Sequence, residues 1–270
     1  MISTAGMSPL MALSLIQRER AVFEDSVRSD AVAKREIAAF RDRIGTIDSV
    51  DALIKDHEVF SFVMKSFGME NQIYAKAMVR KILTSDPEDE KSLVKRLTNA
   101  DYEDLNAAMG FATDGTANAE NFTDPTWIED MVQRYVGQSL VDQQSDVNAS
   151  TGIGLDFLQN ASDLTGWYKV LADKNATTVL RIALGLPESV LSGDIDAQKK
   201  MFEKKMDIAD LQDPEKVQQL LRRYAAIQGA NEASQAPVSI LTLFSSATSS
   251  GTWAPITLDV TSISSFKGYR

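Results

Sequence analysis

Apolar side chains recur at spacings of three and four residues along most of the chain, from about residue 9 to residue 227. That spacing places them on one face of an α-helix. The helices that the pattern predicts lie over residues 9–44, 59–67, 93–97, 105–111, 125–147 and 214–227. Alternation of apolar and polar positions, which is typical of β-strands, is scarce before residue 236. We therefore expect an all-α fold built from many helices.

Proline and glycine mark the expected ends of these helices. An Asp-Pro pair predicts a helix start, because the aspartate oxygen accepts first-turn amides and proline needs no amide hydrogen there. The three pairs are Asp86-Pro87, Asp124-Pro125 and Asp213-Pro214. Glycine reaches the left-handed conformation that ends many helices, so we expect ends at Gly45, Gly68, Gly110 and Gly185.

The second half of the chain resembles the first in its apolar pattern. An offset of 117 residues sets Phe40 on Phe157, Asp56 on Asp173 and Gly68 on Gly185, and further along the offset changes to 109. A helical unit with an uncovered apolar face can bury that face against its own copy. We therefore predict one all-helical domain over 1–228, with an internal duplication of halves at about 9–112 and 124–228.

The segment 229–270 differs in composition from the rest. Fourteen of its 42 residues are Ser or Thr, and few are charged. Most of it is too poor in large apolar side chains to form a core of its own. Two interpretations stay open: a mobile tail, or an arm that docks on a partner or another copy as an extended segment.

The charge of the chain argues against several classes of partner. Its 28 basic and 38 acidic side chains give a net charge of −10, which repels phosphate, so we expect no nucleic-acid partner. No apolar run approaches the ~20 residues of a membrane span. The apolar residues 7–16 lack the basic region and cleavage site of a secretory signal. We therefore expect a cytoplasmic protein by default.

Candidate chemistry is sparse. The chain has no cysteine, which excludes disulfides, thiolate metal sites and cysteine nucleophiles, and it has one histidine, His57. No Gly-x-Ser-x-Gly elbow and no Gly-Lys-Ser/Thr phosphate loop occurs. His57 lies between two acids at a predicted helix start, where a solvated histidine is expected. We predict no catalytic residue and no cofactor.

Two acidic motifs carry the clustered carboxylates that hard metal ions prefer. The stretch from Asp114 to Glu120 resembles part of a calcium loop, but Gly115 follows the first acid immediately, whereas an EF-hand needs glycine at its sixth position. We interpret it as a polar linker, interpret Asp194 and Asp196 as helix caps, and predict no metal. A carboxylate pair of the kind that hydrolases use stays open, because 38 acids do not reveal which pair would converge.

Several motifs together resemble a known family. They are residues 81–89 (KILTSDPED), 97–102 (LTNADY), 183–187 (ALGLP), 207–216 (DIADLQDPEK) and 238–244 (VSILTLF). This constellation, over about residues 9–244, is similar to an uncharacterised bacterial family, domain of unknown function 1217. The resemblance implies an all-helical fold and supplies no catalytic residue. Because genes of that family often lie among flagellar genes, it also implies a role in flagellar structure or assembly.

The function predicted on this basis is that of a non-enzymatic structural or interaction protein, which binds a protein partner or itself. With this function, the protein would be associated with the flagellum or exported by the flagellar apparatus. This location is the alternative to the cytoplasm. The lack of cysteine suits export into an oxidising medium. Two alternatives stay open: a cytosolic chaperone or regulator that binds an amphipathic partner helix, and a carboxylate-dependent enzyme.

Overall fold

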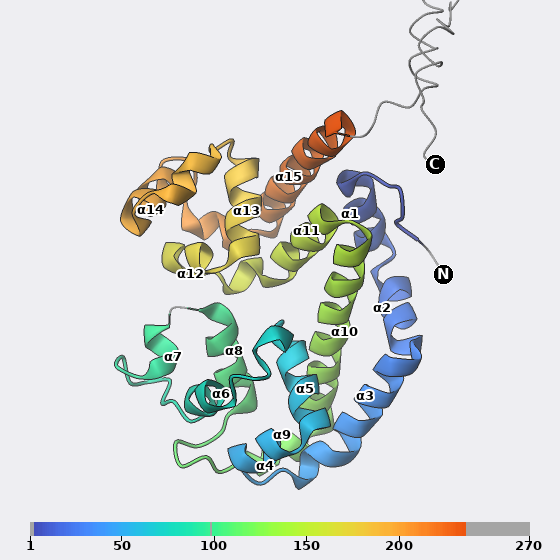
Figure 1. Cartoon of the computed structure of the whole chain (residues 1–270), viewed down its shortest axis with the longest axis vertical. Coiled ribbons are helices and arrows are strands. Elements are labelled where there is room, and N and C mark those ends of the chain that lie inside the picture. Colours follow the sequence, from blue (N-terminus) through green and yellow to red (C-terminus); the bar gives the residue numbers. More distant parts are fainter. Residues whose placement is uncertain (1–2, 98, 236–270) are drawn as a thin grey trace, which may run out of the picture. The chain divides into compact units, whose positions relative to one another are not determined.

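The computed structural model describes residues 3–97 and 99–235, and over these residues the chain forms helices and no β-strand (Figure 1). The predicted all-α fold is confirmed. The first eight α-helices are α1 (Pro9–Arg18), α2 (Arg20–Ser29), α3 (Ala31–Arg43), α4 (Val50–Lys55), α5 (His57–Ser66), α6 (Lys76–Leu83), α7 (Leu93–Arg96) and α8 (Ala100–Met109). The remaining seven are α9 (Ala119–Thr123), α10 (Pro125–Val147), α11 (Ala149–Asn160), α12 (Trp167–Ala172), α13 (Lys174–Ala183), α14 (Ile195–Glu203) and α15 (Pro214–Gln235).

By its internal contacts the chain divides into two units, Met1–Ala230 and Asn231–Arg270. The first unit carries the features described below. From residue 236 onward, the predicted Ser/Thr-rich tail lies outside the described residues, so its mobility or docking stays a prediction. In the described part of the chain, no helix combines the length and apolar character that crossing a membrane requires.

The prediction of a single helix over residues 9–44 is wrong, because three helices, α1, α2 and α3, span this segment. The chain bends at Glu19, whose φ and ψ are −111° and 30°, and again at Asp30, whose ψ of 141° is extended. The carboxylate of Asp30 accepts hydrogen bonds from the N–H groups of Val32 and Ala33, at 2.8 and 3.1 Å. This cap starts α3 as a separate helix. Each interruption is one residue long, so the apolar spacing continues across both.

The Asp-Pro pairs start helices in two of three cases. Pro125 and Pro214 begin α10 and α15, as predicted. At Asp86 the carboxylate accepts from the N–H two residues later at 2.9 Å, as it does at the other two pairs, but the chain there forms a turn and the next helix starts at Leu93. An aspartate side chain can satisfy a turn as readily as a helix start, which the local sequence does not distinguish.

Three of the four predicted glycine ends adopt the left-handed conformation. The φ angles of Gly68, Gly110 and Gly185 are 68°, 60° and 68°, and each follows a helix. Gly45 instead lies inside the 3-10 turn Ile44–Thr46, which follows α3 directly.

The core is centred on α10, which packs against α2, α5, α9 and α11 (Figure 1). Three aromatic rings stack across it. The centroids of Phe40 on α3 and Phe62 on α5 are 4.1 Å apart, and those of Phe62 and Tyr135 on α10 are 4.5 Å apart. Stacked rings contribute attraction beyond the burial of their surface, so this stack ties three helices together.

The element boundaries repeat at the predicted offset in part of the chain. Helices α4 and α5 coincide with α12 and α13 when the chain is shifted by 117 residues, and the turn Ile44–Thr46 coincides with Ala161–Asp163. At the second predicted offset, 109, α8 falls on residues 209–218, which span a 3-10 turn and the start of α15. The elements do not coincide there. The duplication stays a prediction.

Candidate functional site

A pocket with acidic walls opens among the end of α5, α8, α10, α11 and the start of α13. Its volume is about 380 Å³. Five carboxylates line it together with two bases: Asp101, Asp104, Asp142, Asp156 and Asp173, with Arg134 and Lys174. We call this cavity the acidic pocket. In Figure 1, α8 and the α12–α13 pair belong to separate groups of helices that α10 and α11 connect.

Local capping brings two of these acids to the pocket. Asn99 caps α8 by accepting from the N–H of Tyr102 at 3.2 Å, which places Asp101 in the first turn of that helix. Asp173 caps α13 itself, accepting from the N–H groups of Asn175 and Ala176 at 2.8 and 3.0 Å. Both positions are suited to acids, because helix amides at the N-terminus favour negative charge.

Burial and mutual repulsion perturb the carboxylates of the acidic pocket. Burial, with the charges of Asp173, Asp156 and Asp104, raises the pKa of Asp101 to about 7. Burial raises the pKa of Asp156 to about 6, although the hydrogen bond from Asn175 lowers it. Burial is also the main cause that raises the pKa of Asp104 and of Asp173. These groups therefore exchange protons closer to neutral pH than an ordinary aspartate does.

Neutral amides hold the Asp156 carboxylate in place. Its Oδ2 accepts from Nδ2 of Asn175 at 2.8 Å, and its Oδ1 accepts from Nδ2 of Asn160 at 3.3 Å. Amide donors orient a carboxylate without neutralising its charge. The position of Asp156 is thus fixed while its repulsion of the neighbouring acids remains.

The bases around the acidic pocket are partly engaged elsewhere. Nζ of Lys169 on α12 lies 2.9 Å from Oε2 of Glu103 on α8, and each side chain is 22% exposed. The guanidinium of Arg134 lies 5.1 Å from the centroid of the Phe67 ring. Lys174, at the first position of α13, is exposed. The acid walls therefore keep an excess of negative charge.

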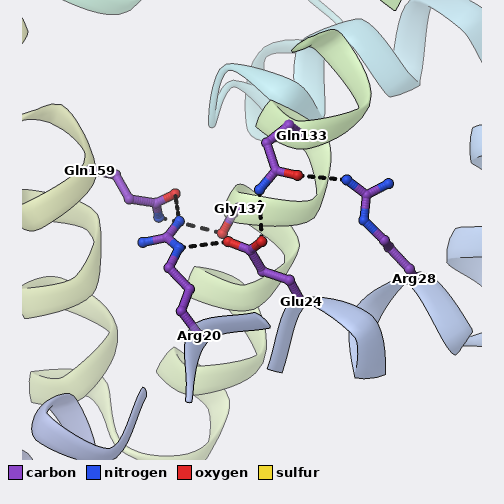
Figure 2. Close-up of polar contacts among 6 residues, drawn as sticks. All are labelled: Arg20, Glu24, Arg28, Gln133, Gly137 and Gln159. Atoms are coloured by element: carbon purple, nitrogen blue, oxygen red, sulfur yellow. Dashed lines mark hydrogen bonds and ion pairs between the residues drawn. The ribbon is translucent and has the colours of Figure 1, made fainter. Parts of the chain in front are cut away.

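A second polar hollow, of about 590 Å³, adjoins the acidic pocket and shares with it Ser66, Arg134, Gln138 and Asn160. Figure 2 shows the contacts at its Arg20 side. Nε of Arg20 lies 2.6 Å from Glu24 Oε1, and Gln133 donates to Glu24 Oε2 at 2.8 Å while it accepts from Arg28 at 2.6 Å. This network joins α2 to α10, and its polar atoms satisfy one another. We interpret it as a brace.

Gly137 permits the close approach of α11 at this brace. A Cβ at residue 137 would lie 2.5 Å from Oε1 of Gln159, and Nε2 of Gln159 donates to the Gly137 carbonyl at 3.4 Å. Arg20 donates to the same Gln159 oxygen at 3.5 Å (Figure 2). The absence of a side chain at Gly137 thus brings α2, α10 and α11 into one polar contact.

The residues considered from sequence lie apart from the acidic pocket. His57 is exposed at the first position of α5, with Nδ1 3.3 Å from Oγ of Ser61, whereas the last residue of that helix, Ser66, lines the pocket. Asp114 is exposed in a loop and accepts from the N–H of Thr116 at 2.8 Å. Asp194 caps α14, accepting from the N–H of Asp196 at 2.9 Å, as predicted. Among the described residues, no group of three or more acids or histidines is placed to hold a metal ion.

Sequence reasoning missed the pocket acids, although one local signal points to Asp156. Asp156 lies between Leu155 and Phe157, with no Lys or Arg three or four residues away. Acids that lack a local base suggest a tertiary role. Their convergence, however, depends on how the helices pack.

The fold and the site define the class: an all-α protein with a cavity of convergent, partly buried carboxylates. The sequence profile of the family described as protein of unknown function (DUF1217) matches residues 66–217. The chain belongs to this family, which confirms the resemblance seen in its motifs. The matched residues include every residue that lines the acidic pocket.

A solved structure has a similar fold. It is the X-ray crystal structure of protein AGR_C_984 from Agrobacterium tumefaciens, which is 28% identical to this chain with a TM-score of 0.72. The similarity covers 80% of this chain and 91% of the Agrobacterium chain. No curated protein matches the sequence significantly.

Proposed function

We propose that the protein is a non-enzymatic interaction protein, whose acidic pocket receives a basic group of a protein partner. The observation that carries this proposal is the convergence of Asp101, Asp156 and Asp173 from three helices on one cavity. Burial, together with the repulsion from neighbouring acids that include Asp156 and Asp173, raises the pKa of Asp101 to about 7. An ammonium or guanidinium group in the pocket would replace that repulsion by attraction.

The size and polarity of the pocket support a side chain as its occupant. A cavity of about 380 Å³ is within the range of sites that enclose small groups. Neutral amides already fix Asp156, so the acid would meet a basic group with little loss of side-chain freedom. Partly buried charges are also screened less by salt than charges on the surface.

The setting we propose is flagellar structure or assembly, which the family resemblance implies. The partner is then a flagellar component or a second copy of this chain. The absence of cysteine throughout the sequence is compatible with passage through an export channel into an oxidising medium.

Peptide binding tests the pocket. We expect a lysine or arginine hexapeptide to bind the wild-type protein and a glutamate hexapeptide not to bind, measured by calorimetry at low salt. Changing Asp101→Asn together with Asp156→Asn should weaken binding by about tenfold or more, equivalent to about 1.4 kcal/mol. The matched control is Asp25→Asn together with Asp89→Asn, which removes two exposed charges outside the pocket. Equal losses in both proteins would contradict the proposal.

Cell fractionation tests the setting. A tagged chromosomal copy should reach the basal body or the medium only in cells with a working flagellar export apparatus. A protein that stays in the cytoplasm in both strains contradicts an exported role. In that outcome a defined complex with one exported protein would favour the chaperone alternative.

The pocket also supports a second candidate, a carboxylate-dependent enzyme. Asp101 and Asp156, with pKa values raised to about 7 and about 6, have the proton affinity that general acid–base catalysis uses near neutral pH. An enzyme would show a turnover that Asp101→Asn abolishes without unfolding the chain. Binding of the basic peptide without any such turnover in glycoside, ester and amide hydrolysis assays would favour the interaction protein.

A further inference from the structure

We propose that the acidic pocket is a pH-sensitive joint, in which α8 moves away from the α12–α13 pair as the carboxylates on both sides ionise. This inference concerns the free protein and does not depend on the proposed partner. It rests on the position of the acids on facing helices, on the cavity between them, and on an ion pair that links the two sides.

The carboxylates lie on opposite walls of the cavity. Asp101 and Asp104 come from α8, whereas Asp156 comes from α11 and Asp173 from the start of α13. The charges of Asp156 and Asp173 act on Asp101 across this space. Ionisation therefore adds like charge to both walls, and the resulting force pushes the walls apart.

All walls of the cavity except the end of α5 contribute charged groups to this balance. The charged groups that face the cavity or border it are Asp101, Glu103 and Asp104 on α8, Arg134 and Asp142 on α10, Asp156 and Asp163 on α11 and the turn after it, and Lys169, Asp173 and Lys174 on α12 and α13. The end of α5 contributes Ser66, Phe67 and Gly68, which carry no charge. Seven acids against three bases leave an excess of four negative charges when all are ionised.

The ion pair between Lys169 and Glu103 opposes the separation. It joins α12 to α8 at 2.9 Å and is largely shielded from solvent. At low pH, the protonated carboxyls can also donate hydrogen bonds across the cavity, which a pair of carboxylates cannot do. The closed arrangement is therefore favoured when the pocket acids hold their protons.

The direction of the pH effect follows from the ionisation of these groups. The pKa of Asp101 is raised to about 7 and that of Asp156 to about 6, and burial also raises the pKa of Asp104 and Asp173. Below about pH 5 we expect Asp101 and Asp156 to be neutral and the joint closed. Between about pH 6 and pH 7, the loss of protons should open it.

The lack of cysteine makes the joint directly measurable, since two introduced cysteines carry the only thiol labels. We choose Ala107→Cys on α8 and Lys200→Cys on α14, which packs against α12; both positions are exposed. The control pair is Ala107→Cys with Lys81→Cys on α6, because α6 and α8 pack together on the same side of the cavity. Spin-label distances are recorded from about pH 5 to pH 8 in the absence of any ligand.

We expect the distance between residues 107 and 200 to lengthen as pH rises, while the control distance stays constant. Asp101→Asn with Asp156→Asn should hold the first pair at its low-pH distance throughout the range. Lys169→Gln should lengthen the same distance already at pH 5, because it removes the link between α12 and α8.

Two results would overturn the joint: a 107–200 distance that is the same at pH 5 and pH 8, or a pH response of equal size in the double Asn variant. The first result is measured on the labelled protein without the Asn substitutions. It therefore does not depend on whether the double Asn variant folds. If the 107–200 distance lengthens with pH but the protein does not bind the lysine hexapeptide, the joint is supported and the proposed function is contradicted.

Discussion

The two helix pairs α4–α5 and α12–α13 have the same local design. Each pair is interrupted by an aspartate that caps the second helix, Asp56 before α5 and Asp173 before α13. Each second helix is followed by a glycine with a φ of 68°, Gly68 or Gly185. The shared boundaries, 117 residues apart, follow from the same capping and ending signals in both segments.

The surroundings of the two caps differ. Oδ2 of Asp56 lies 3.3 Å from Nη1 of Arg43, so a base faces that carboxylate. Asp173 faces other acids in the acidic pocket, and burial raises its pKa. The capping aspartate of α5 therefore forms an ion pair, whereas the capping aspartate of α13 is part of the acidic wall of the pocket. The local sequence determines the helix start, whereas tertiary packing determines the charge environment.

The largest expected difference between the pairs concerns their cores. Phe62 on α5 stacks between Phe40 and Tyr135, whereas the position 117 residues later is Val179, buried on α13. We expect Phe62→Ala to lower the free energy of unfolding by about 3–5 kcal/mol, and Val179→Ala by about 2 kcal/mol, because the larger side chain leaves a larger cavity.

Urea denaturation at constant pH measures both losses, with Val32→Ala as the control at a position that is 52% exposed. The control should change the unfolding free energy by less than about 0.5 kcal/mol. Losses of equal size for Phe62→Ala and Val179→Ala would show that the aromatic stack adds no stability beyond aliphatic packing.

The caps should respond to the removal of charge with opposite signs. Asn also caps helices, so Asp→Asn retains the cap while it removes the charge. At about pH 8, Asp173→Asn should raise the free energy of unfolding, on the order of 1 kcal/mol, because it removes an ionised group from an acidic, partly buried site. Asp56→Asn should lower it by about 0.5 kcal/mol, because it breaks the pair with Arg43.

The gain at Asp173 should depend on pH in a defined direction. Because the pKa of this carboxyl is raised in the native state, the native protein holds its proton to higher pH than the unfolded chain does. Its unfavourable contribution is therefore absent below the unfolded value of 3.8 and develops as pH rises through the native pKa. A gain that is as large at pH 3.5 as at pH 8 would contradict this account.

Much of the fold could be predicted from the sequence, because its signals are local. The Asp-Pro starts of α10 and α15 and the left-handed Gly68 and Gly185 depend only on neighbouring residues. The bend at Asp30 was missed, because apolar spacing reports which face is buried and is insensitive to a one-residue interruption. A cap inside a periodic segment should therefore be read as a potential break.

The candidate site could not be predicted in the same way. Asp101 and Asp173 are 72 positions apart in the chain, and each has a local capping environment that explains an acid there. What makes them a site is that α8 and α13 face one cavity, which is a property of the packing. Acids without a local base, such as Asp156, are the signal that a reading of the sequence can use.

The smallest expected difference between the two pairs lies at their ending glycines. Gly68→Ala and Gly185→Ala should each lower the free energy of unfolding by about 1 kcal/mol, because a Cβ disfavours the left-handed conformation. A Cβ at residue 68 would also lie 3.4 Å from Oε1 of Gln138, which lines both hollows, whereas a Cβ at residue 185 meets nothing within 4 Å. We therefore expect a further loss of a few tenths of a kcal/mol at residue 68 alone.

Gly166→Ala is the control, since that glycine has open space and an extended φ of −154°. If Gly68→Ala and Gly185→Ala lower the free energy of unfolding equally, the Gln138 side chain moves aside without strain. The acidic pocket would then tolerate a change at its α5 edge.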